Sequence, residues 1–221
     1  MKKKQKNYNQ KFKIFGRKKG RKSLQNISTE TFDKYLVNLT TDFISKKIIL
    51  DIGSGNGEST LFLSRKYPNN LIIASEIYQD GNTNLCQELH RNEIDNVKIF
   101  NQNVLILFEE FKLDNLIKEI WILFPDPWPK KKHSKRRLIN SSFIEKVFYL
   151  LEENGKIYIV TDNSSYFIFF VELNTEFSQF RNCEFIGRER SIAYDSIRFS
   201  SLYIQNWRCI NIYSKIIKYV T

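Results

Sequence analysis

The stretch IILDIGSGNGE, residues 48–58, sets the architecture expected for this chain of 221 residues. Its first half is an almost continuous apolar run, which is typical of a buried strand. The glycines at 53, 55 and 57 then allow a tight turn and let a ligand approach the backbone closely. A helical pattern follows at about 57–66. The stretch therefore predicts a strand, a ligand-binding turn and a helix in succession.

The same alternation of strand and helix continues to about residue 161. It predicts an α/β, Rossmann-like fold, with a mostly parallel central sheet and helices on both faces. A further helix is expected at 166–174, and a terminal, antiparallel pair of strands at 203–207 and 210–213. The expected strands are Ile48–Ile52, Leu71–Ser75, Val97–Phe100, 120–124 and 157–161, and the expected helices are 57–66, 79–92, 104–118 and 139–151.

Upstream of the first strand, Ser28 has the character of a helix N-cap. Phe32, Tyr35, Leu36 and Leu39 recur after it at helical spacing, which favours a helix that packs on the core. We expect residues 1–27 to form a basic, mobile segment and residues 28–221 to form a single domain.

The charge of the chain is concentrated in two places. The formal net charge is +11, yet the first 22 residues hold eleven Lys and Arg with no acid, and residues 130–137 hold six more. The remainder is therefore mildly acidic. This asymmetry favours a nucleic-acid partner.

The cysteines and histidines exclude several kinds of site. Cys86, Cys183 and Cys209 are far apart, so no disulfide framework is expected, and the two histidines suggest no metal centre. Neither a membrane span nor a signal peptide is visible. We expect a cytoplasmic protein; an organelle transit segment is the alternative, disfavoured by the excess of Lys over Arg and the scarcity of serine.

The second informative stretch is PDPWPKKKHSKRR, residues 125–137, which follows an apolar run. Its three prolines should hold Asp126 and Trp128 in a stiff loop. The cationic tail suits an anionic polymer, although a solvated charge run is the alternative. Trp128 has two interpretations, a stacking partner for a base or a residue that packs the loop onto the sheet.

Polar residues follow the expected strands. Glu76 ends the second strand, where it can accept hydrogen bonds from a ribose diol, and Asn103 follows the third. The glycine spacing is G-x-G-x-G rather than the dinucleotide fingerprint G-x-G-x-x-G, which disfavours a nicotinamide-linked dehydrogenase. It matches the S-adenosylmethionine loop better, with Asp51 facing the ammonium of the ligand; a purely structural turn is the alternative.

Together, the glycine loop, Glu76 and the Phe-Pro-Asp-Pro-Trp loop with its Lys/Arg tail resemble the tRNA (guanine-N7-)-methyltransferase family of the bacterial single-chain type. The likeness extends to FGRKKGR at residues 15–21 and to Thr161-Asp162-Asn163.

The resemblance implies S-adenosylmethionine as cofactor, tRNA as partner, and methyl transfer to N7 of a guanine in the tRNA variable loop. It implies no metal or membrane, and a monomer or weak dimer is expected. It assigns Asp126 as the active-site acid, also near the methyl donor. By position it assigns cofactor binding to Asp51, Gly53, Gly55, Gly57, Glu76 and Asn103, and substrate or RNA binding to Lys130, Lys132, Lys135, Arg136, Arg137, Asp162 and Ser201.

The sequence departs from the family pattern at four positions. Asp51 and Asn103 replace the more usual Glu and Asp, and Ile204 stands where the late Thr-x-x-Glu motif has its acid, with Ser201 in place of the threonine. Two alternatives therefore stay open: a degenerate methyltransferase fold that binds RNA without catalysis, and a methyltransferase for another RNA base or a protein.

Overall fold

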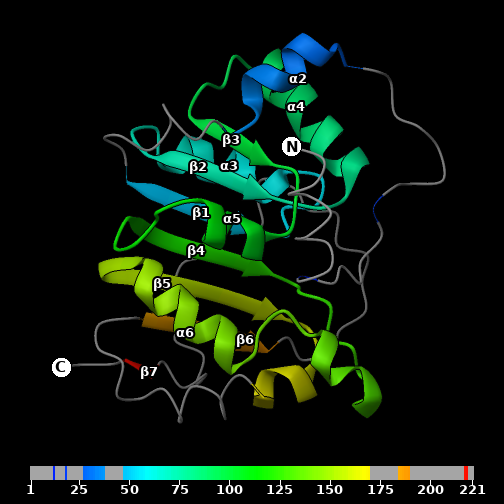
Figure 1. Ribbon diagram of the computed structural model, residues 1–221, viewed down its shortest axis with the longest axis vertical. Helices are drawn as coiled ribbons and strands as arrows, with labels where there is room; N and C mark the ends of the chain where they lie inside the picture. Colours follow the sequence, from blue (N-terminus) through cyan, green and yellow to red (C-terminus); the bar gives the residue numbers. More distant parts are fainter. Residues whose placement is uncertain are drawn as a thin grey trace. The chain divides into compact units, whose positions relative to one another are not determined.

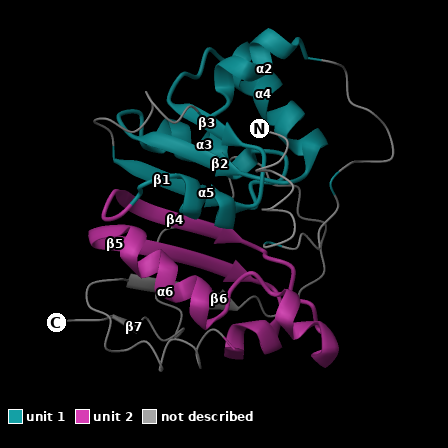
Figure 2. Ribbon diagram, viewed as in Figure 1, with its two compact units in different colours: residues 1–113 teal, residues 114–221 magenta. Residues whose placement is uncertain are grey.

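The structure is a computed structural model, and it describes residues 12, 18, 27–37, 47–169, 184–189 and 217–218, the last two ranges by their backbone. The chain divides into two compact units, residues 1–113 and 114–221 (Figure 2).

The first unit contains the glycine-rich stretch and alternates strand with helix (Figure 1). Strand β1 pairs in parallel with β2, and β2 with β3, in a register that starts at Ile48 opposite Leu71. Every residue of β1 and β2 is buried, as expected for parallel strands covered on their faces. The elements are α2 Thr29–Tyr35, β1 Ile48–Ile52, α3 Glu58–Lys66, β2 Leu71–Ser75, α4 Gln79–Arg91, β3 Val97–Phe100 and α5 Val104–Glu110.

Because these strands are parallel, their carboxyl ends meet at one edge of the sheet. The glycine loop follows β1, Glu76 follows β2 and residues 101–103 follow β3. Two bonds tie the last two loops together: the Glu76 amide donates to Phe100 O at 3.1 Å, and Ser75 Oγ donates to Gln102 O at 3.4 Å. The candidate cofactor residues of this unit are thereby gathered at one edge.

The second unit contains the proline-rich stretch and is also built on parallel strands. Strand β5 pairs in parallel with both β4 and β6, and β6 pairs antiparallel with β7. A helical turn at 164–169 follows β5. The elements are β4 Ile117–Leu123, the 3-10 helix η1 Lys131–Arg136, α6 Ser141–Leu150, β5 Leu151–Thr161, β6 Glu184–Glu189 and β7 Ile217–Lys218.

The Rossmann-like alternation and the first three strands agree with the sequence prediction residue for residue, and Ser28 caps α2 through a bond from Thr31 N. Three predicted bounds were wrong by more than two residues. Strand β4 begins at Ile117 rather than at residue 120. The helix expected at 104–118 ends at Glu110, because the chain then turns and starts β4 at Ile117. Strand β5 begins at Leu151 rather than at residue 157.

Some expectations fall outside the described residues, namely the basic segment for most of its length and the strands at 203–207 and 210–213. Within the described ranges, no helix is long and apolar enough to cross a bilayer. No cluster of His, Cys, Asp and Glu suited to a metal occurs there either.

Candidate functional site

Glu76 organises the glycine loop of the first unit. Its Oε2 accepts a hydrogen bond from Gly55 N at 2.9 Å, and its Oε1 accepts from the amides of Ile77 at 2.6 Å and Tyr78 at 2.9 Å. Bonds to an ionised carboxylate are stronger than neutral ones. One side chain therefore links the loop after β1 to the start of α4.

Gly53 and Gly55 leave room beside the backbone of this loop. Their φ angles are 73° and 55°, in the left-handed region that favours glycine. A Cβ added at either position would meet nothing within 4 Å. A ligand can therefore approach both backbones directly, and this open edge with an acid beside it fits an S-adenosylmethionine-sized group.

Two other glycines fit tightly against their neighbours. A Cβ at Gly57 would lie 2.6 Å from Leu85 Cδ1, and one at Gly81 would lie 2.1 Å from Gly55 O. Gly81 in α4 therefore lets the helix touch the glycine loop. Sequence reasoning missed Gly81, because a lone glycine in a helical pattern gives no sign of what it contacts.

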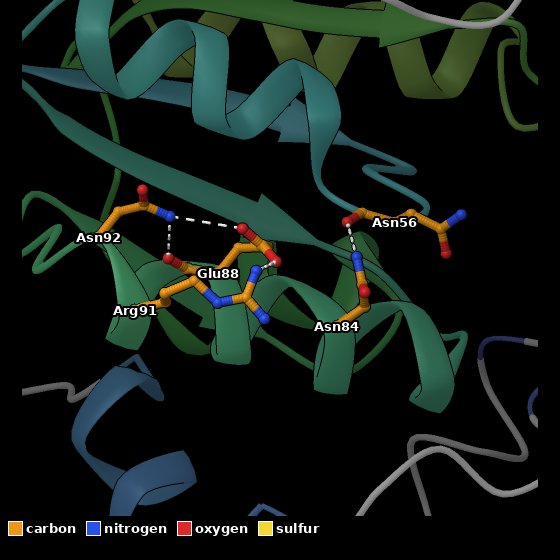
Figure 3. Close-up of polar contacts among 5 residues, drawn as sticks. All are labelled: Asn56, Asn84, Glu88, Arg91 and Asn92. Carbon is orange, nitrogen blue, oxygen red and sulfur yellow. Dashed lines mark hydrogen bonds and ion pairs between the residues drawn. The ribbon is translucent and has the colours of Figure 1, made fainter.

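Helix α4 holds the loop through side-chain amides as well. Asn82 Nδ2 donates to Glu76 O at 2.9 Å, and Asn84 Nδ2 donates to Asn56 O at 2.9 Å (Figure 3). Further along the helix, Arg91 and Asn92 both contact Glu88 (Figure 3). The loop-facing turns and the distal turn of α4 thus carry separate polar networks.

Asp51 is buried at the end of β1, with 1% of its surface exposed. Its Oδ2 accepts hydrogen bonds from Ser59 Oγ and Thr60 Oγ1, both at 2.6 Å. Burial raises the pKa of Asp51 to about 6, although the two hydroxyls lower it and the charge of Glu76 raises it further. The carboxylate lacks a cation among the described side chains, which suits a ligand that brings an ammonium.

Asn103 is the N-cap of α5, and its Oδ1 accepts from Leu105 N at 2.9 Å. The side chain is half-buried at the edge that also carries Glu76. The side-chain amide of Asn103 therefore caps the helix, in addition to any contact that it makes with a ligand.

In the second unit the Phe-Pro-Asp-Pro-Trp loop leaves β4 with a strained backbone. Phe124 has φ 51° while its amide still donates to Val160 O at 2.8 Å, and Trp128 has φ 42° although it precedes a proline. Left-handed geometry costs a non-glycine residue about 1–2 kcal/mol. Asp126 lies exposed between them. Strain of this kind is concentrated at functional sites.

The cationic tail separates into exposed lysines and folded-back residues. Lys130, Lys132 and Lys135 are exposed on η1 or at its start. Arg136, by contrast, is half-buried, and its Cζ lies 5.0 Å from the centroid of the Trp128 ring. His133 meets the same ring edge-on at 5.9 Å. The tryptophan is therefore engaged with residues of its own segment, and both interpretations of Trp128 stay predictions.

Arg137 is folded back as well. Its Nε donates to Pro127 O at 2.8 Å, and its Cζ lies 4.8 Å from the Tyr166 ring centroid and 5.3 Å from that of Phe169. Tyr166 is fully buried, and burial raises its pKa to about 12. Sequence reasoning missed Tyr166 and Phe169, whose only signal was their helical spacing.

The Thr-Asp motif lies next to this pair of rings. Thr161 is buried at the end of β5 and its Oγ1 accepts from Asn163 N at 3.2 Å. Asn163 Oδ1 in turn accepts from Tyr166 N at 2.9 Å. Asp162 between them is exposed. Ser201, the last substrate contact implied by the resemblance, lies outside the described residues.

Comparison with known proteins agrees with the family resemblance seen in the sequence. The family model described as "Putative methyltransferase" matches residues 45–208. A tRNA (guanine-N(7)-)-methyltransferase of Neorickettsia sennetsu is 32% identical over 157 residues, covering 69% of this chain and 70% of that protein. Proteins of the same name from Buchnera aphidicola and Leptospira interrogans are 31% and 41% identical, over 156 and 117 residues.

The chain matches about half to about two thirds of the length of these curated relatives. The match to the Buchnera protein covers 65% of each chain, and that to the Leptospira protein covers 53% of this chain and 54% of the other. Both the glycine loop and the Phe-Pro-Asp-Pro-Trp loop lie inside the matched family model. With the Neorickettsia protein matched over more than two thirds of its length, the chain belongs to the tRNA (guanine-N(7)-)-methyltransferase family.

Proposed function

We propose that this chain transfers a methyl group from S-adenosylmethionine to N7 of a guanine in tRNA, at position 46 of the variable loop. The observation that carries the proposal is the shared name of its relatives, tRNA (guanine-N(7)-)-methyltransferase, at 31–41% identity. The sites in the two units are consistent with it.

The first unit offers the residues to hold S-adenosylmethionine. The open backbone at Gly53 and Gly55 would receive it, and Asp51 and Glu76 would face its ammonium and its ribose. When bound, this group supplies a methyl made electrophilic by the sulfonium. Gly57 would support the cofactor site by packing against Leu85, and Asn103 would support it by capping the start of α5.

The second unit offers Asp126 to the guanine. N7 carries a free lone pair and no proton, so the reaction needs no general base, and the enzyme contributes mainly proximity and orientation. The exposed carboxylate of Asp126 can accept from the N1–H and exocyclic amine of guanine. Its negative charge also favours the cationic methylated base as it forms. Asp162, also exposed, is a second candidate for a substrate contact.

The exposed lysines of the second unit suit the tRNA backbone. Lys130, Lys132 and Lys135 present flexible ammonium groups to solvent on one short segment. Such groups bind phosphates through counterion release, so affinity should fall steeply as salt rises. Arg136 adds a positive charge to this segment, although its guanidinium also lies over the Trp128 ring.

The decisive experiment incubates the purified chain with unmodified tRNA and methyl-labelled S-adenosylmethionine, then digests the tRNA and identifies the labelled nucleoside. Label in 7-methylguanosine from the variable loop is the expected result. Label in another nucleoside would refute guanine N7 as the acceptor and identify a different target base. Absence of label together with absence of heat on titration with S-adenosylmethionine would identify a non-catalytic RNA-binding module.

A further inference from the structure

Arg137 makes a directed contact with the backbone of the Phe-Pro-Asp-Pro-Trp loop. Its Nε donates to Pro127 O at 2.8 Å, and its own amide donates to Ser134 O at 3.0 Å. The Pro127 carbonyl belongs to the residue directly after Asp126. The guanidinium therefore ties the far end of η1 to the peptide beside the candidate acid.

The guanidinium also rests on two aromatic rings. Tyr166 and Phe169 lie one turn apart in the helix at 164–169, with ring centroids 6.1 Å apart and planes inclined by 27°. Arg137 Cζ lies within 5.3 Å of both centroids. A planar guanidinium stacks on such a surface in a way that an ammonium cannot, so lysine is not an equivalent residue here.

This pair of rings is itself fixed. The Tyr166 hydroxyl accepts from Ile139 N at 3.3 Å in a buried setting, and Asn163 caps the helix through Tyr166 N. Asn163 is in turn bonded to Thr161 at the end of β5. Hydrogen bonds and ring contacts thus run from the core strand to Pro127 without a break.

We propose that Arg137 is a positioning residue that holds Asp126 in place through the Pro127 peptide, rather than a phosphate ligand. The inference rests on the function proposed above and revises the role that the family resemblance gives to this arginine. The Nε of Arg137 and the ring-facing surface of its guanidinium are already engaged within the unit, whereas Lys130, Lys132 and Lys135 are exposed. The loop needs such a restraint because Phe124 and Trp128 hold it in left-handed geometry.

The test is Arg137→Lys, which keeps the positive charge and loses both the Nε–H bond and the planar stack. We expect kcat for tRNA methylation to fall by about 10- to 100-fold, as misplacement of a reacting group does. KM for tRNA and the salt dependence of tRNA binding should stay unchanged. Trypsin should cleave the 130–136 segment faster, a readout that needs no activity.

Two comparison variants sharpen the test. Arg65→Lys makes the same exchange at an exposed arginine of α3 and should change none of these quantities. Phe169→Leu removes one ring of the pair while leaving Arg137 in place, and it should accelerate cleavage in the same way. Both changes disrupt the same contact between the guanidinium and the rings. The variant that combines Arg137→Lys with Phe169→Leu should therefore be cleaved no faster than Arg137→Lys alone.

The opposite pattern would overturn the proposal. A phosphate ligand predicts near-normal kcat and cleavage for Arg137→Lys, and a salt slope lowered by about one for Arg137→Gln. If the wild-type chain methylates no tRNA, the function proposed above fails, yet faster cleavage in Arg137→Lys and Phe169→Leu would still show that the arginine restrains the loop. Unchanged cleavage in two variants that fold normally would refute the positioning role by itself.

Discussion

The Cβ that alanine would add at Gly81 falls 2.1 Å from the carbonyl oxygen of Gly55, a separation that no folded protein tolerates. At this point the backbone of helix α4 and the backbone of the glycine loop therefore touch with no side chain between them. Gly55 is thus held twice: its carbonyl oxygen lies against Gly81 of α4, and its amide donates to Glu76.

Gly81→Ala tests that contact. In an unconstrained helix this substitution stabilises by up to about 1 kcal/mol. Here we expect a loss of stability and a fall in S-adenosylmethionine affinity, because α4 or the loop has to move. Thermal unfolding and calorimetric titration measure the two effects. Thr83→Ala, two residues further along α4, is the matched control, and a stabilised Gly81→Ala variant with normal affinity would contradict the prediction.

Glu76→Gln should disorganise the loop while conserving the shape of the side chain. The amide keeps one acceptor oxygen but turns an NH2 donor toward backbone amides that also donate, at Gly55 or at Ile77 and Tyr78. Losing charged acceptors for buried amides costs about 1.5–3 kcal/mol. We expect cofactor affinity to fall at least tenfold by titration. Glu93→Gln supplies the control, and equal affinities would remove Glu76 from the site.

Asp51 should make stability depend on pH. Its folded pKa, about 6, lies above the ordinary value of 3.8, so the folded chain binds the proton more tightly than the unfolded chain. The resulting stabilisation is complete below pH 3.8 and is lost as the pH rises through 6. The Asp51→Asn variant has no such loss. Between pH 4 and pH 7, its unfolding free energy should therefore rise relative to that of the wild type by about 2 kcal/mol.

Denaturant titrations across that pH range measure the difference between the two proteins. A difference that stays constant with pH would show that the carboxyl titrates normally in the folded chain. Cofactor affinity supplies an independent check: it should be weaker in Asp51→Asn, because the neutral amide lacks the charge that an ammonium favours.

Asp126→Ala separates binding from transfer. The carboxylate is exposed, so its removal should leave the fold and S-adenosylmethionine binding intact. Methyl transfer to tRNA should fall by two orders of magnitude or more if the acid orients the guanine. Single-turnover kinetics measure the rate of methyl transfer, and calorimetric titration measures the affinity for S-adenosylmethionine. Asp114→Ala is an exposed control in the same unit, and near-normal transfer by Asp126→Ala would exclude the acid from the mechanism.

The strands could be predicted because their signal is local. The apolar runs at Ile48–Ile52 and Leu71–Ser75 are buried throughout; Gly53 follows the first run and Asn70 precedes the second. The predicted helix at 104–118 was too long because Leu113 and Ile117 continue an apolar spacing that belongs partly to a turn and partly to β4. Periodicity alone does not distinguish these cases over so short a span.

The placement of Asp51, Glu76 and Asp126 at or just beyond the carboxyl ends of strands could be predicted, while their roles stay predictions. The contacts that shape the candidate site could not be predicted, because they join residues distant in sequence. Arg137 and Tyr166 are 29 positions apart, and nothing in a run of basic residues shows which of them folds back on an aromatic ring. The role that the resemblance gave to Arg137 followed from its position in the basic run, and so omitted its contact with Pro127.

The separation of the cationic tail into exposed lysines and folded-back arginines also bears on how such a segment diverges. The lysines carry charge without contributing to the shape of the loop, while Arg136 and Arg137 contribute to its shape. Under the proposed function, lineages can therefore gain, lose or shift lysines to suit their own tRNAs without displacing Asp126. The arginines lack that freedom, so substitution rates should differ between neighbouring codons of one short basic run.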